Sequence, residues 1–234
     1  MPKNLPFAKR PCAYCGRVTG RNQAEHVVPK CLYTAHIPSN AQRLTVPACR
    51  ECNHGFSLSE AHFRNIVAAS GLEPSPERRE LLESVLRSLR EPKSGRRDLE
   101  RLWQQMIDAP VLKADGTPYK KVVPHADEEV GFIARKVVRG LVHSLNWQTV
   151  IPDNHVIVRE YVDPPEEVAE VLEDGYCVPG HFSSQYLLID ERFAEEFRRD
   201  MHSLWQVRFF DLPLSCLVVQ RVATTTNCTT SSRA

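Results

Sequence analysis

Four cysteines and one acidic residue followed by a histidine are the residues of this chain best suited to chemistry. Glu25 and His26 lie between two Cys-x-x-Cys pairs. Four thiolates in two such pairs suit a tetrahedral Zn²⁺ with Zn–S distances of about 2.3 Å, and they leave no coordination position open. We therefore expect a structural zinc site on the four cysteines, which are Cys12, Cys15, Cys49 and Cys52.

A second candidate site requires oxygen ligands and a base. Glu25 offers a carboxylate oxygen, and Asn53, directly after the last cysteine of the second pair, offers a carbonyl oxygen. Both suit a hard cation such as Mg²⁺ or Mn²⁺. His26, with an unperturbed pKa of about 6.5, can be neutral and accept a proton from water. The alternative for His26 is a half-buried strand histidine without a chemical role.

Basic residues surround these candidates. We expect Lys30, Arg43 and Arg50 to contact phosphate groups, and the alternative for each is a solvated basic side chain. Residues 1–54 hold eight Lys and Arg against two Asp and Glu, a net charge of +6, whereas the rest of the chain holds 22 against 27, a net charge of −5. A basic segment on an acidic body indicates a polyanionic partner, unless it is only a basic solvated surface.

The elements expected around the candidates are a hairpin and a helix joined to the cysteine pairs. Their order is a zinc-binding turn (knuckle) at the first cysteine pair, a strand, a loop, a second strand, a second knuckle at the second cysteine pair, and a helix. Residues 23–28 are short and partly β-branched, which predicts a strand carrying Glu25 and His26 near its end. Residues 43–46 predict a second strand that pairs with the first, and a helical pattern runs from residue 53 to about residue 71. Adjacent strand side chains point to opposite faces, so Glu25 and His26 can serve one cation and one water only where the strand bends or ends.

The motifs Cys-x-x-Cys, Glu-His-Val-Val-Pro and Cys-x-x-Cys-Asn, in this order, resemble the zinc-knuckle branch of the HNH nucleases, whose active site is a ββα-metal motif. Their spacing is similar to that of phage endonucleases that resolve branched DNA and of bacterial HNH proteins. The resemblance covers about the first quarter of the chain. It implies that Glu25 and Asn53 hold the catalytic metal and that His26 is the general base. Asn40 would be the loop asparagine, although it lies farther from the second cysteine pair than usual, and His54 is a further candidate ligand or phosphate contact.

Beyond the motif, the sequence predicts a helical and mixed α+β body. We expect an α+β chain with an HNH nuclease domain over 1–72, a C-terminal domain with a small antiparallel sheet over 73–222, and a disordered tail over 223–234. Apolar periodicity and turn residues predict helices over 76–90, 99–107, 127–145, 165–172 and 193–201, strands over 156–162, 185–189, 204–210 and 214–219, and a turn at 114–117.

Composition limits the expected size of the core and the expected location of the protein in the cell. A chain of 234 residues with 42% hydrophobic residues can bury a substantial core. No apolar run approaches the 18 or so residues of a membrane span, and prolines and charges interrupt the N-terminus where a signal peptide would be apolar. We expect a soluble cytoplasmic protein with no membrane partner, in which the cysteines are reduced.

The resemblance implies a metal-dependent endonuclease that hydrolyses phosphodiester bonds, with DNA as the partner and substrate. A homodimer or another assembly through the C-terminal part is a further expectation. Three alternatives stay open: a zinc-knuckle module that binds nucleic acid or protein without cleaving, an RNase on the same scaffold, and a purely structural zinc ribbon. The combination of Glu25, His26 and Asn53 favours cleavage, because binding alone does not require it.

Overall fold

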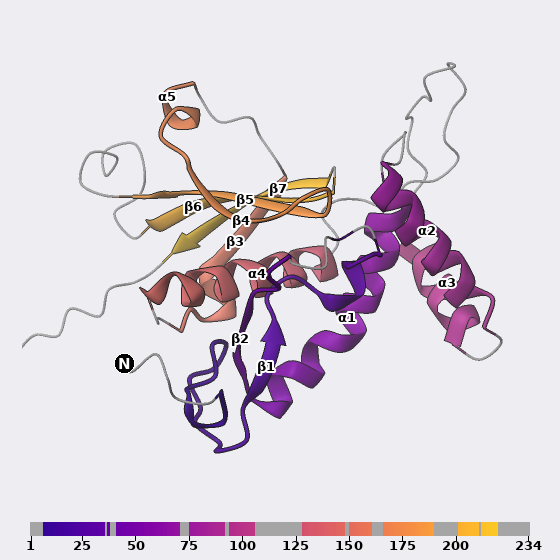
Figure 1. Ribbon diagram of the computed structural model, residues 1–234, viewed down its shortest axis with the longest axis horizontal. Helices are drawn as coiled ribbons and strands as arrows, with labels where there is room; N and C mark the ends of the chain where they lie inside the picture. The colour runs from indigo at the N-terminus through magenta and orange to yellow at the C-terminus, as the bar shows by residue number, and fades with distance from the viewer. Residues whose placement is uncertain are drawn as a thin grey trace, which may run out of the picture.

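A small hairpin, a buried helix and a larger antiparallel sheet are stacked in that order (Figure 1). The computed structural model describes residues 7–35, 37, 41–70, 75–91, 94–105, 128–147, 150–160, 166–189, 201–210 and 212–219. The predicted turn at 114–117, the tail at 223–234 and Asn40 lie outside these residues. Within them, no helix is both long and apolar enough to cross a membrane.

The α-helices are α1 Arg50–Ala69, α2 Pro76–Leu89, α3 Ser94–Gln105, α4 Glu128–Val142 and α5 Glu166–Ala169. The shorter helical turns are η1 Phe7–Lys9, η2 Lys30–Leu32 and η4 Asp153–His155, and a π-helical turn, η3 His143–Trp147, follows α4. The strands are β1 Gln23–His26, β2 Thr45–Ala48, β3 Val156–Glu160, β4 Glu173–Val178, β5 Phe182–Leu188, β6 Met201–Phe209 and β7 Leu212–Val219.

Strands β1 and β2 form the predicted antiparallel hairpin, and α1 follows directly. Glu25 lies opposite Val46, and His26 lies opposite Thr45. Strand β1 ends at His26, two residues earlier than predicted, and β2 is shifted two residues toward the C-terminus. Cys49 is the N-cap residue of α1, so the second cysteine pair spans the junction of strand and helix.

Strands β3 to β7 form the second sheet, in the order β3-β7-β6-β5-β4 with antiparallel pairing throughout. Four of these strands overlap the predicted ones. Strand β4 was not predicted, because Gly175 interrupts a short polar segment, and the pairing with β5 is irregular between Asp174 and Cys177. The α+β class is confirmed in this coarse sense: helices together with small antiparallel sheets.

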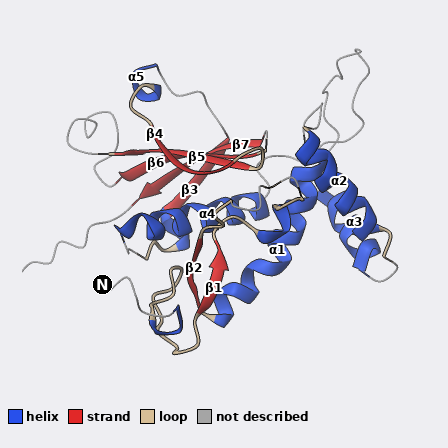
Figure 2. Cartoon of the chain, viewed as in Figure 1, coloured by secondary structure: helices blue, strands red, loops and turns tan. Residues whose placement is uncertain are grey.

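Helix α4 is the layer between the sheet and the hairpin (Figures 1 and 2). It contacts α1 on one side and strands β3 and β7 on the other. Its predicted apolar face is buried, but Lys136 and Arg139 are buried as well, so the helix is enclosed on nearly all sides. Gly140 permits close packing against Val27, the residue after β1, because a Cβ atom at position 140 would lie 3.0 Å from both methyl groups of Val27.

The hydrophobic core is continuous from the cysteine-bearing segment to the large sheet. It includes Val27 and Phe63 on one side of residue 72 and Ile133 and Trp205 on the other. Helix α2 begins as predicted, with Ser75 as its N-cap residue accepting a hydrogen bond from the Arg78 backbone N–H at 3.2 Å.

Candidate functional site

The four cysteines predicted to bind zinc lie together. Their sulfur atoms are all within 4.8 Å of one another, and the Sγ atoms of Cys15 and Cys49 are 3.7 Å apart. In a tetrahedral site with Zn–S bonds of about 2.3 Å, neighbouring sulfurs are about 3.8 Å apart. The cluster therefore fits one metal ion such as zinc. The hydrogen bond between Cys12 and Cys52 lowers the pKa of the first thiol and raises that of the second, as expected for sulfurs close enough to share one cation.

Backbone contacts hold the first cysteine pair against β2. The Ala13 backbone N–H donates to the Pro47 carbonyl at 2.7 Å, and the Gly16 N–H donates to the Cys12 carbonyl at 2.8 Å. Gly16 has φ of +76°, a left-handed conformation that glycine adopts without strain. The tight turn after the second cysteine thus brings both thiols of the pair to one side.

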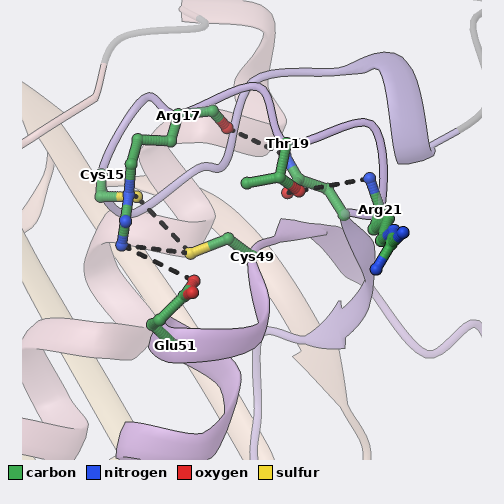
Figure 3. A network of polar contacts seen from close by, with 7 residues as sticks. Cys15, Arg17, Thr19, Arg21, Cys49 and Glu51 are labelled. Carbon is green, nitrogen blue, oxygen red and sulfur yellow. Dashed lines mark hydrogen bonds and ion pairs between the residues drawn. The ribbon is translucent and has the colours of Figure 1, made fainter.

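The positively charged guanidinium of Arg17 lies next to the sulfur atoms of the cysteine cluster (Figure 3). Its Nε lies 3.4 Å from the Cys15 sulfur, and its Nη2 lies 3.8 Å from the Cys49 sulfur and 3.7 Å from a carboxylate oxygen of Glu51. The pKa of Arg17 is raised, first by the hydrogen bond to Cys15. Four thiolates around Zn²⁺ carry a net charge of −2, so a guanidinium here stabilises the loaded site.

His26 lies at the end of β1 among positive charges. Its ring is half-buried and meets the Tyr33 ring edge-on at 6.1 Å between centroids, and the guanidinium of Arg43 covers that tyrosine ring at 5.1 Å. Burial, and then the charges of Lys30, Lys136 and Arg43, lower the pKa of His26. The imidazole is therefore neutral at pH 7 and able to accept a proton.

Glu25 points in the other direction, into the layer between the hairpin and α4. Its Oε1 accepts a hydrogen bond from Lys136 Nζ at 2.6 Å, and the ammonium is fully buried. Burial raises the pKa of the Glu25 carboxyl, and Lys136 opposes that shift only in part. The carboxylate next to His26 is thus already paired with a cation of the chain itself.

The surroundings of Glu25 fit an ammonium better than Mg²⁺. Lys136 Nζ also contacts the Glu60 carboxylate and lies 2.9 Å from the carbonyl oxygen of His26. A metal ion bound to Glu25 would lie close to the Lys136 ammonium and be repelled by it. Two positive unit charges about 4 Å apart repel by about 4 kcal/mol at an effective dielectric constant of about 20, and the double charge of Mg²⁺ doubles this repulsion. Glu60 lies two helical turns beyond Asn53, near the middle of α1, so the cation that Glu25 and Glu60 share comes from well beyond the position of Asn53.

No protein-family model, curated protein or solved structure matches this chain. The resemblance to HNH nucleases therefore rests on the motifs and their spacing, and the site is interpreted from its own residues.

The other predicted site residues lie around the hairpin and the start of α1. Asn53 is half-buried in the first turn of α1, where its backbone N–H donates to the Cys49 carbonyl at 3.0 Å. Lys30, Arg43, Arg50 and His54 are exposed. Lys30 and Arg43 are among the leading charges that shift the pKa of His26, and Arg50 is not. The joint binding of one ion by Glu25 and Asn53 stays a prediction.

Residues of the C-terminal part brace the candidate site, and sequence reasoning did not single them out. Arg139 Nη2 donates to the carbonyl oxygen of Tyr14, inside the first cysteine pair. Tyr176 on β4 donates from its hydroxyl to the Gln42 carbonyl at 2.6 Å and accepts from the Leu44 N–H at 3.2 Å. One signal in the sequence could have indicated these contacts: Lys136 and Arg139 lie in a helix whose apolar face was predicted to be buried. Buried cations require partners, so the two residues predict contacts with other parts of the chain.

Proposed function

We propose that this chain is an endonuclease of the HNH type that hydrolyses phosphodiester bonds in DNA, with His26 as the general base. The observation that carries the proposal is the position of His26: a half-buried imidazole at the end of β1, whose pKa is lowered first by burial and then by nearby cations that include Lys30 and Arg43. Phosphate groups attracted by these two cations would lie next to a base that takes a proton from the attacking water.

Each part of the hairpin has a separate role in this proposal. Zinc on the four cysteines fixes the hairpin to α1 and takes no part in the reaction, because four thiolates leave no position for water. Lys30 and Arg43 bind phosphate oxygens and stabilise negative charge in the transition state. The resemblance implies Mg²⁺ or Mn²⁺ on Glu25 and Asn53, but Lys136 already engages the Glu25 carboxylate. Omitting divalent ions therefore tests whether cleavage needs a metal ion at all.

A second candidate is a zinc-knuckle module that binds nucleic acid without cleaving it. The ion pair between Glu25 and Lys136 favours this candidate, because it engages the carboxylate that metal-dependent cleavage would use. The two candidates share the basic surface of Lys30 and Arg43, so binding assays alone do not separate them.

The test is cleavage by the purified, zinc-loaded chain. Plasmid, linear, branched and single-stranded DNA, and RNA, are incubated with and without Mg²⁺ or Mn²⁺. We expect cleavage of DNA that falls by about 100-fold or more in His26→Ala, within the range for loss of a general base. His155→Ala is the matched control, because His155 is also half-buried but lies before β3. Cleavage unchanged in His26→Ala contradicts the proposal, and binding without any cleavage favours the second candidate.

A further inference from the structure

Lys136 has a complete set of acceptors in the layer between β1, α1 and α4. Its Nζ lies 2.6 Å from Glu25 Oε1 and 2.9 Å from the His26 carbonyl oxygen, and it contacts Glu60 Oε1. An ammonium has three N–H donors, so three acceptors satisfy it fully. The Phe56 ring adds a cation–π contact, with its centroid 5.0 Å from Nζ.

The acceptors around Lys136 are also the kind of ligands that a divalent cation requires. Two carboxylates and one backbone carbonyl are hard oxygen donors, suited to Mg²⁺ or Mn²⁺. They come from the end of β1 and from α1, the two elements between which a divalent ion was expected. A cation is therefore present at this position, but the chain supplies it from α4.

We propose that Lys136 is the resident cation of the Glu25–Glu60 cluster, in place of a divalent metal ion, and that removal of its amine converts the cluster into a divalent-cation site. The single positive charge of the ammonium balances one of the two carboxylates, and the same nitrogen donates a hydrogen bond to each of them. Lys136 is fully buried, so the ammonium occupies the space between these oxygens and has no direct access to solvent. Mn²⁺ can bind the same oxygens only if the amine leaves this buried position.

The packing of α4 keeps the amine in place. Lys136 is one helical turn before Gly140, where α4 touches Val27 of the hairpin. Arg139 on the same helix donates to the Tyr14 carbonyl, so α4 is fixed to both the zinc knuckle and the end of β1. The inference concerns the cation alone, and it stands whether or not the chain cleaves nucleic acid.

The first experiment measures Mn²⁺ binding to the zinc-loaded full chain, with free Mn²⁺ followed by electron paramagnetic resonance. We expect wild type and Glu25→Gln to bind Mn²⁺ equally weakly. Lys136→Met, which keeps the length of the side chain but removes the amine, is expected to gain one site at least tenfold tighter than any in wild type. The double variant Lys136→Met with Glu25→Gln is expected to lose that site. A wild-type Mn²⁺ site that Glu25→Gln abolishes overturns the proposal, and so does a folded Lys136→Met that gains none.

A second experiment needs no substitution at Lys136. Wild-type chain is methylated reductively with formaldehyde and cyanoborohydride, with and without Mn²⁺, and the lysines are mapped by mass spectrometry. We expect Lys136 to stay unmodified in both samples, whereas exposed Lys30 reacts in both. Modification of Lys136 that appears only with Mn²⁺ shows that the metal displaces the amine and overturns the proposal. This result and the wild-type titration decide whether Lys136 or a metal ion is the resident cation even if Lys136→Met does not fold.

Discussion

Arg139 on α4 donates a hydrogen bond from Nη2 to the carbonyl oxygen of Tyr14, a residue between the two cysteines of the first pair. The same guanidinium donates from Nε to the Ile151 carbonyl at 2.7 Å, pairs with Asp153 at 3.0 Å and covers the Tyr14 ring at 5.5 Å. One buried side chain thus joins the first cysteine pair, α4 and the segment that leads into β3. The C-terminal part is therefore a structural support of the cysteine cluster.

Arg139→Met is expected to lower the free energy of unfolding by about 2–6 kcal/mol, because it removes the donor of two buried carbonyl oxygens, those of Tyr14 and Ile151, at about 1–3 kcal/mol each. Asp153 keeps its ion pair with Arg135. Urea unfolding monitored by circular dichroism measures the change. Arg96→Met is the control, because the Arg96–Glu100 pair is exposed on α3 and such pairs contribute about 0.3–0.5 kcal/mol. Equal losses in the two variants would show that Arg139 has no special role.

Zinc binding is expected to depend on the clustered cysteines alone. The wild-type chain should carry one Zn²⁺ per molecule by elemental analysis, and Cys49→Ser should carry none, because a neutral hydroxyl replaces one of four thiolates. Cys177→Ser is the matched control, since Cys177 is exposed on β4 outside the cluster. Zinc retained by Cys49→Ser, or lost from Cys177→Ser, would contradict the assignment.

Arg17→Gln is expected to weaken zinc affinity by about tenfold, at the low end of what loss of an outer-shell partner costs, because Arg17 is largely exposed. Competition with a chromophoric chelator measures the affinity. Arg21→Gln serves as the control: Arg21 lies in the same loop, where its backbone N–H donates to Thr19 Oγ1 at 3.2 Å, a hydrogen bond that the substitution leaves in place (Figure 3). The role assigned to Arg17 fails if both variants bind zinc like wild type.

The local features of the candidate site could be predicted from the sequence because they depend on short-range patterns. Two Cys-x-x-Cys pairs suffice to indicate a metal cluster, and the β-branched segments around Glu25 and Val46 indicate a hairpin. The N-cap at Ser75 and the apolar face of α4 follow from the same kind of local rule. The structure confirms the hairpin, the N-cap and the buried apolar face, and it brings the four cysteines close enough together to hold one metal ion.

The partners of Glu25 could not be predicted in the same way. Lys136 follows it by 111 residues, and no local rule connects a strand carboxylate with a cation on a distant helix. Residue type alone made Glu25 look like a free metal ligand, whereas its burial makes a compensating cation necessary. Strand β4 was missed for a related reason, since Gly175 and its polar neighbours form a strand only beside the rest of the sheet.

The pKa of His26 gives the final prediction. Burial and the charges of Lys30, Lys136 and Arg43 lower this pKa in the folded chain. Between the folded and unfolded pKa values the unfolded chain binds more protons, so this contribution to stability is complete above pH of about 6.5 and is lost as the pH falls through the folded pKa. If His26 is the general base, the rate of cleavage declines on the same acidic side, because only neutral imidazole accepts a proton.

NMR titration of the His26 imidazole in the zinc-loaded chain checks this prediction. We expect a midpoint below the ordinary value of about 6.5. Lys30→Met removes one of the cations and should move the midpoint, and the acidic limb of any cleavage profile, to higher pH. Arg50→Met should move both less than Lys30→Met does, because Arg50 is not among the leading charges that shift this pKa. A midpoint at or above the ordinary value, or one that does not respond to Lys30→Met, would remove the electrostatic basis for His26 as a base surrounded by phosphate-binding cations.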